Sequence, residues 1–406
     1  MASSRCGGGW GDLPPDLLAR IADALTIKPY LRARAVCSAW RAALPPASPS
    51  LLVRDLDNRH SAWCLSPRIS TPLHKLMAAA LSPQQSSCVV GSGGGGFVAV
   101  HASDWFGIVN PLSGKVVSFN SFPQLYVPRG EKLVVNKVVF APNPMRAHFA
   151  AAAITGRGCV ITYTAVGNAG WTDFQCPRLA GGIADVVYHE EHVYCLARTG
   201  DVHVLRLTAA DDRLAAFEPL FDKDGTVFDA TAAFAPPHDT IRECAGEKNL
   251  VVCNDNGDMY QIWRNDTCAR IRTLPGGGKY RVENSQIFVF RYYPHRRPCW
   301  VAVEDLGGRS VFIGKNNAVA LRVDGGGDAS WLRGNCVYWI DTNHCPARAK
   351  VFDMVTRKSA QCFPGAADHS VICWCFLHEK QSSSSKGVFG CLDSLQPGSH
   401  DKAWLI

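Results

Sequence analysis

The sequence predicts a mainly β protein in which a small all-α unit at residues 10–44 precedes a β-propeller of about six or seven blades at 51–406. Helical periodicity is confined to the first unit and to a turn or two at His74–Leu81, whereas the other apolar residues from Leu51 onward fall into short runs bounded by Gly, Asn, Asp or Pro. These runs recur at roughly 40 to 50 residues, a spacing typical of propeller blades. The intervals between them lack amphipathic segments of helical length, which disfavours an α/β fold.

The first unit follows a glycine-rich leader, residues 1–9, that we expect to be disordered. Two sets of apolar residues then recur at helical spacing: Leu17, Leu18, Ile21 and Leu25, followed by Ala33, Val36, Cys37, Trp40 and Leu44. Asp12 suits the start of the first helix, and Lys28-Pro29 is expected to separate the two. Residues 45–50 are rich in proline and predict a short, stiff linker.

A unit of about 35 residues is too small to bury a core of its own, because domains below roughly 40 residues usually need a metal, disulfides or a partner. Cys6 and Cys37 lie far apart and have no neighbouring histidines. We therefore predict that the apolar stripe of this unit binds another protein. The alternative is that the helices only dock on the C-terminal domain.

The residue types and their spacing in this unit resemble the F-box motif. The resemblance rests on Leu13-Pro14, Asp16-Leu17-Leu18, Ile21, Leu25, Val36-Cys37 and Trp40-Arg41. It implies three helices that dock onto a Skp-type adaptor of a cullin-RING ubiquitin ligase. The implied adaptor-binding residues are Leu13, Pro14, Ile21, Val36 and Trp40 as anchors, with Leu17, Leu25, Cys37 and Arg41 beside them.

The predicted strands form about seven groups along the chain. They lie at 97–119, at 137–174, at 183–207, at 249–263, at 287–323, at 331–340 and at 349–363. Turn residues separate the runs within a group, as at Thr199-Gly200-Asp201 and at the hairpin dipeptide Asn256-Gly257. The last blade could be sealed by Leu51–Arg54 or by Ala62–Leu65.

Four of these segments, KVVFAPNP, DVVYHEEHVYCLARTGDV, VFIGKNNAVAL and RGNCVYWID, are similar to the plant F-box-associated family known as domain of unknown function 295. The similarity spans roughly residues 85–363, and the serine-rich tail at 364–406 departs from it. It implies a β-propeller related to kinase-interacting F-box proteins, which serves as a target-binding platform. The two resemblances together imply a non-catalytic substrate-recognition subunit of an SCF-type (Skp-cullin-F-box) E3 ubiquitin ligase.

The composition of the chain narrows its possible partners and its location in the cell. The 42 basic and 35 acidic residues give a net charge of +7, and the basic residues are scattered rather than gathered into an arm for nucleic acid. No apolar run approaches the roughly 18 residues of a membrane span, and the N-terminus lacks the apolar segment of a signal peptide. We expect a soluble protein of the cytoplasm, the nucleus or both. Its 17 cysteines, an odd number, predict reduced thiols such as Cys159, Cys195, Cys253 and Cys336.

Several short motifs suggest cofactor or metal chemistry but have simpler readings. Gly91–Gly96 fits G-x-G-x-x-G, yet a strand at Phe97–Val100 follows where a dinucleotide site needs a helix, so we predict a hairpin loop and no cofactor. The histidines of His189-Glu190-Glu191-His192 stand three apart in a predicted turn, which disfavours zinc. Cys373, Cys375 and His378 would supply three ligands, but no Cys-x-x-Cys accompanies them, and we predict no metal.

One loop stands out as a candidate target-binding surface. Cations and aromatic residues are interleaved between two strands in Arg291, Tyr292, Tyr293, His295, Arg296 and Arg297. Arginine suits bidentate contact with phosphate, so this loop would bind an acidic or phosphorylated target, while an ordinary polar loop is the simpler reading. A propeller-fold enzyme such as a hydrolase, or a ligase-independent module for protein or nucleic acid, remain the alternative functions.

Overall fold

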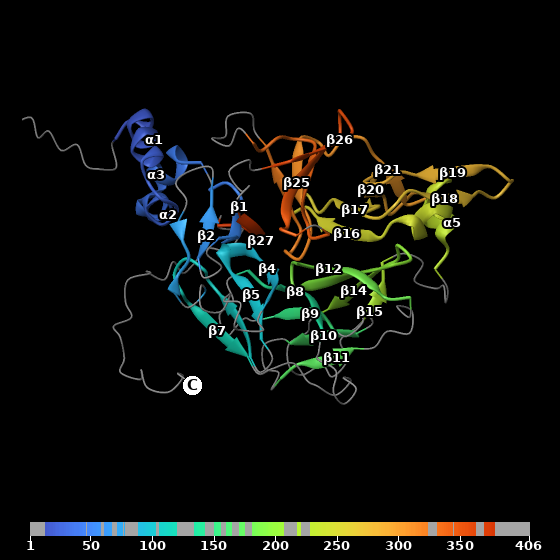
Figure 1. Cartoon of the computed structure of the whole chain (residues 1–406), viewed down its shortest axis with the longest axis horizontal. Coiled ribbons are helices and arrows are strands. Elements are labelled where there is room, and N and C mark those ends of the chain that lie inside the picture. The colour runs from blue at the N-terminus through green and yellow to red at the C-terminus, as the bar shows by residue number, and fades with distance from the viewer. Residues whose placement is uncertain are drawn as a thin grey trace, which may run out of the picture.

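The computed structural model describes residues 13–45, 47–57, 61–66, 71–75, 77, 88–102, 105–119, 134–142, 150–155, 160–164, 170–174, 181–206, 217–220, 228–323, 331–343, 345–362 and 369–377. Three short helices stand at the edge of a six-bladed β-propeller (Figure 1). The mainly β fold is therefore confirmed, with six blades. The predicted leader at 1–9 and the end of the tail, 378–406, lie outside the described residues.

The helices are α1 (Pro15–Asp23), α2 (Ile27–Val36) and α3 (Ser38–Ala43). Pro15 opens α1, where its missing N–H has no intrahelical partner. The chain breaks between Asp23 and Ile27 rather than at Lys28-Pro29 as expected, because Pro29 lies in the first turn of α2, a position that tolerates proline. At the start of α3 the Cys37 Sγ accepts a hydrogen bond from the Trp40 N–H at 3.4 Å.

The six blades follow one another along the chain. Blade 1 holds β1 (Ser50–Asp55), β2 (Ala62–Leu65), β3 (Thr71–Pro72) and β27 (His369–Cys375). Blade 2 holds β4 (Cys88–Ser92), β5 (Val98–His101), β6 (Phe106–Val109) and β7 (Val116–Phe119). Blade 3 holds β8 (Val135–Phe140), β9 (Ala151–Thr155), β10 (Val160–Thr164) and β11 (Thr172–Phe174). Blade 4 holds β12 (Ile183–His189), β13 (His192–Ala197), β14 (Val202–Arg206) and β15 (Phe217–Pro219); blade 5 holds β16 (Glu247–Val252), β17 (Met259–Arg264), β20 (Ile287–Tyr292) and β21 (Trp300–Ala302). Blade 6 holds β22 (Arg309–Phe312), β23 (Val319–Arg322), β24 (Cys336–Asp341), β25 (Arg348–Asp353) and β26 (Lys358–Gln361).

Short elements connect or extend these blades. Between blades 4 and 5 lie α5 (Ala230–Ala233), α6 (His238–Ile241) and the 3-10 turn at Arg242–Cys244. A two-stranded hairpin, β18 (Arg270–Thr273) with β19 (Lys279–Val282), is inserted in blade 5 and projects from the ring on the side away from the helices (Figure 1).

The ring closes where the two ends of the propeller meet in blade 1. Strand β1 pairs antiparallel with β27, with Leu51 opposite Trp374, and with β2 on its other side. Leu51–Arg54 is thus the sealing strand, as one of the two predictions had it. The inner strand of this blade, β27, comes from the part of the tail that departs from the family pattern.

The loop between β22 and β23 crosses the propeller axis. Ser92 at the end of β4 forms a parallel bridge with Asn316, and its carbonyl accepts a hydrogen bond from the Asn317 N–H at 2.7 Å. The Asn317 side chain then bonds both backbone groups of Tyr188 in β12, accepting from its N–H at 2.8 Å and donating to its carbonyl at 3.0 Å. Blades 2, 4 and 6 are therefore tied together at the end of the axis where β4 and β12 finish.

The predicted turns form as expected. Glu190 and Glu191, with φ of 46° and 65°, join β12 to β13, and Gly257, with φ of 71°, lies in the turn between β16 and β17. The Gly-rich stretch joins β4 to β5 through a short 3-10 turn at Gly94–Gly96 and is a hairpin loop.

The described part of the chain has neither a cluster of metal ligands nor a helix that could span a membrane. No three His, Cys, Asp or Glu side chains there gather closely enough to hold a metal ion, while His378 lies outside it. None of the helices there has the length and apolar character needed to cross a membrane. Cys195, Cys253 and Cys336 are buried free thiols, and Cys159 is outside the described residues.

Candidate interaction surfaces and the axial cavity

The helices have one face buried against the propeller and another open to solvent. Leu18 and Ala22, at 2% and 1% exposure, pack in a cluster that also contains Leu52 of β1 and Cys64 of β2. Leu17 and Ile21 lie one position earlier on α1 and are 40% and 42% exposed. Since positions i and i+4 share a helix face, these two side chains form one apolar strip on the solvent side.

The other residues predicted to bind an adaptor are exposed to different degrees. Val36 at the end of α2 is 59% exposed, and Pro14 is exposed. The rest are half-buried: Leu13, Leu25, Cys37, Trp40 and Arg41. Trp40 packs against the cluster that joins the helices to blade 1, so part of its surface is already covered by this chain.

Sequence reasoning missed the contacts that hold the linker to the helices. The Tyr30 hydroxyl donates to the Pro45 carbonyl at 2.5 Å, and the Arg34 Nε donates to the Leu44 carbonyl at 3.1 Å. Tyr30 is 1% exposed. No feature of the sequence around Tyr30 indicates this partner, which follows only from the fold.

The six residues predicted to bind a target lie at the end of β20 (Arg291 and Tyr292) and in the loop that leads to β21 (Tyr293, His295, Arg296 and Arg297). The Arg291 guanidinium forms an ion pair with Asp258 at 2.8 Å, and Tyr292 packs on Trp300 with ring centroids 5.0 Å apart. Tyr293 lies between two cations, with the guanidinium carbon of Arg291 5.2 Å and that of Arg296 4.4 Å from its ring centroid. Arg291 and Tyr292 are thus engaged within the fold, Tyr293 is half-buried, and the other three residues of the set are exposed: His295, Arg296 and Arg297.

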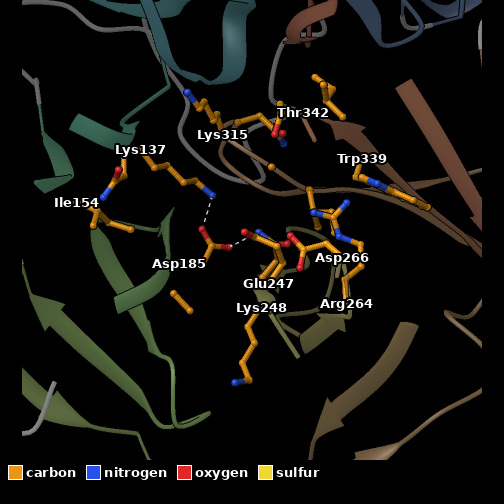
Figure 2. Close-up of a pocket in the computed structure, with 18 of the residues that line it drawn as sticks. Lys137, Ile154, Asp185, Glu247, Lys248, Arg264, Asp266, Lys315, Trp339 and Thr342 are labelled. Atoms are coloured by element: carbon orange, nitrogen blue, oxygen red, sulfur yellow. Dashed lines mark hydrogen bonds and ion pairs between the residues drawn. The ribbon is translucent and has the colours of Figure 1, made fainter. Parts of the chain in front are cut away.

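A cavity of about 390 Å³ lies on the propeller axis and was not predicted. The first residues of β8, β12 and β16 and the end of β24 form its walls, and the crossing segment Gly314–Asn316 lies among its lining residues (Figure 2). Thr342 and Asn343 on its rim are exposed, whereas Ile313 and Cys373 deeper in it are buried. It is therefore a pocket that opens at the face where these inner strands begin.

One wall of the cavity is a closed polar network. The Lys137 Nζ lies 2.6 Å from the Asp185 carboxylate, and both side chains are nearly inaccessible, at 6% and 1%. Asp185 also accepts hydrogen bonds from the backbone of Val186 and Leu250, both at 2.9 Å, and from the Asn249 amide at 3.2 Å. The network joins blades 3, 4 and 5, and all its charge is compensated internally (Figure 2).

The opposite wall carries charges that are not compensated in this way. The Arg264 guanidinium lies over the Trp339 ring, 5.2 Å from its centroid, and its Nε is buried without a hydrogen-bond partner. The Asp266 Oδ1 is buried without one as well. Burial raises the pKa of the Glu247 carboxyl, and the neighbouring Arg264 opposes this shift while Asp266 and Asp185 add like-charge repulsion. Burial lowers the pKa of Arg264, and the nearby carboxylates of Glu247 and Asp266 oppose that shift.

Removing one member of the closed network should strongly destabilise the fold. Asp185→Ala leaves the Lys137 ammonium buried and unpaired, so we expect a loss of about 3 to 5 kcal/mol in the free energy of unfolding. Urea denaturation followed by tryptophan fluorescence measures it. Replacing both partners, Lys137→Met with Asp185→Leu, should recover only part of the loss, because the Val186 and Leu250 N–H groups and the Asn249 amide still lose their acceptor.

The matched control for this experiment is Glu304→Ala. It breaks the exposed pair with Arg357, whose side chains are 83% and 63% accessible, and should change stability by less than about 1 kcal/mol. Equal losses for the Asp185 and Glu304 variants would contradict the structural role of the network.

Comparison with known proteins agrees with the fold. The KIB1-4 beta-propeller family model matches residues 66–363, a segment that begins after α1–α3 and ends before β27. No curated protein matches the chain.

Three of the solved structures that match this chain have low identity to it. YCF48 from Cyanidioschyzon merolae is 12% identical over 58% of this chain and 74% of its own, with a TM-score of 0.30. A luciferin-regenerating enzyme is 9% identical over 72% and 91%, with a TM-score of 0.33, and the Cps50 (Swd1) propeller of Myceliophteria thermophila is 11% identical over 79% and 87%, with a TM-score of 0.35. The family match alone covers most of the chain, and this protein therefore belongs to the KIB1-4 beta-propeller family.

Proposed function

We propose that this chain is a non-catalytic substrate-recognition subunit of an SCF-type E3 ubiquitin ligase. In this proposal α1–α3 dock a Skp-type adaptor, and the propeller binds a protein target for ubiquitination. The supporting observation is the apolar strip of Leu17 and Ile21, with Val36 nearby in the chain, which stays exposed although the adjacent Leu18 and Ala22 are buried.

Exposed apolar side chains are unevenly distributed over the molecule. Among the described residues, eight large apolar side chains are exposed, and three of them lie on α1 and α2. A single exposed leucine needs no explanation, but a group of them on a short helical unit is typical of a surface that a partner covers. An amphipathic helix that lays such a strip into a partner's groove is a common mode of recognition.

The propeller would supply the second binding surface. The exposed part of the β20–β21 loop, His295 to Arg297, presents cations suited to an acidic or phosphorylated segment. Holding a target near a charged ubiquitin carrier raises its effective concentration, so the receptor itself needs no catalytic residues. We place this activity in the cytoplasm, the nucleus or both.

The experiment that tests the proposal is co-expression of the full chain with a Skp-type adaptor, followed by gel filtration. We expect the two proteins to elute together as a 1:1 complex. Elution of a folded chain and the adaptor in separate peaks, at concentrations well above the micromolar range, would refute the ligase role.

A further inference from the structure

The axial cavity offers charged side chains that form no ion pair with another described residue, and we call them the unpaired set. Lys137 and Asp185 compensate each other, and the Lys248 side chain turns away from the cavity and donates to the Arg198 carbonyl (Figure 2). Arg264 and Asp266 remain, each with a buried atom that lacks a hydrogen-bond partner.

Three further charges complete this unpaired set. Glu247 stands at the mouth of the cavity beside Arg264, and Lys315 rises from the crossing segment (Figure 2). Arg198 lines the cavity with an exposed side chain. None of the three forms an ion pair with another described residue. The unpaired set therefore contains three cations, Arg198, Arg264 and Lys315, and two carboxylates, Glu247 and Asp266.

Because the cavity presents charges of both signs, the charge of a ligand determines how well it can bind there. A simple anion would meet Arg264 but would stand beside the carboxylates of Glu247 and Asp266, and a simple cation would meet those carboxylates but would stand beside Arg264. Either ligand leaves like charges facing each other in a partly desolvated pocket, which is costly. A ligand that carries both charges close together avoids both penalties.

We propose that the axial cavity is a binding site for a compact zwitterion, whose anionic group contacts Arg264 and whose cationic group contacts Glu247 and Asp266. A volume of about 390 Å³ lies within the usual range for small-ligand pockets and suits a group of amino-acid size. The raised pKa of Glu247 and the lowered pKa of Arg264 agree with this site, since a ligand cation favours the carboxylate and a ligand anion favours the guanidinium. The same chemistry is available from a free amino-acid-like molecule or from adjacent acidic and basic side chains of a peptide.

The test uses ω-amino acids of graded length as probes. Glycine, β-alanine, 4-aminobutyrate and 6-aminohexanoate are titrated into the full chain by calorimetry and by saturation-transfer NMR, with acetate, butyrate, ethylamine and butylamine as compounds that carry one charge. We expect at least one zwitterion to bind with a Kd about tenfold lower than the matched single-charge compounds, a difference of about 1.4 kcal/mol. Zwitterions that bind no better than those compounds would overturn the proposal.

Variants assign the binding to this cavity. Glu247→Gln keeps the shape of the side chain and should weaken zwitterion binding about tenfold, as should Arg264→Gln. Arg281→Gln is the control, because it removes an equally charged residue on the exposed face of the β18–β19 hairpin. Binding that is unchanged in Glu247→Gln, which stands at the open mouth and is not expected to disturb folding, would also overturn the proposal.

A last set of probes identifies the source of the zwitterion. A blocked tetrapeptide with adjacent glutamate and lysine, Ac-Ala-Glu-Lys-Ala-NH2, is compared with the free ω-amino acids. Cavity-dependent binding of the peptide supports a segment of a target protein, and binding of the free compounds alone supports a small metabolite. Binding of neither class overturns the site while leaving the adaptor experiment untouched.

Discussion

The Ile21→Asp chain should lose adaptor binding by at least about 30-fold while it unfolds like the wild type. A central apolar side chain in a protein interface is worth about 2 kcal/mol or more, and a carboxylate in its place adds a desolvation cost. Ile21 is 42% exposed in the free chain, so the substitution removes little from the core. Calorimetric titration with the purified adaptor measures the affinity, and scanning calorimetry measures the unfolding temperature.

Two control variants test whether the effect of Ile21→Asp belongs to the exposed face of α1. Leu18→Asp should lower stability by several kcal/mol, because Leu18 is 2% exposed and would bury an unpaired charge. Val355→Asp, at a side chain that is 77% exposed and distant from the helices, should affect neither property. Adaptor binding at wild-type affinity by both Ile21→Asp and Val36→Asp would contradict the proposed docking face.

Local chemistry made much of the fold predictable. Turn residues such as Asn256-Gly257 fix hairpins through their own backbone preferences, and the blade period follows from the recurrence of short apolar runs. For the sealing strand the sequence offered two candidates, Leu51–Arg54 and Ala62–Leu65, and only the pairing of β1 with β27 decides between them.

There is a physical reason why the contacts near the propeller axis could not be predicted from the sequence. Asn317 and Tyr188 are 129 residues apart, and Lys137 and Asp185 are 48 apart, so their pairing depends on ring geometry that no local pattern encodes. The apolar stripe of α1 was also too wide to separate Leu17 from Leu18, since only the docked position of the helix decides which of the two is covered. The cationic and aromatic residues around the β20–β21 loop could be recognised from the sequence, but the ion pair between Arg291 and Asp258 could not.

Trp374→Ala should be among the most destabilising single substitutions in the chain. Trp374 is 0% exposed and makes ring contacts across blades 1 and 6, edge-on to Phe312 at 4.9 Å and stacked on Trp331 at 6.3 Å. Truncating a buried aromatic side chain of this size costs about 3 to 5 kcal/mol. Urea unfolding should show a lower midpoint with an unchanged m-value, because the same surface is exposed on unfolding.

The position of Trp374 makes this loss a test of ring closure. It lies on β27 opposite Leu51, so its contacts join the end of the propeller to its beginning and stabilise the ring as a whole. Trp374→Phe should cost less, because the indole Nε1 has no hydrogen-bond partner to lose and most of the ring volume remains. Trp63→Ala in β2, which lies on the other side of β1 from β27, is the matched control, and its half-buried side chain should give a smaller loss. If Trp374→Ala were no less stable than Trp63→Ala, the pairing of β27 with β1 would not be what closes the propeller.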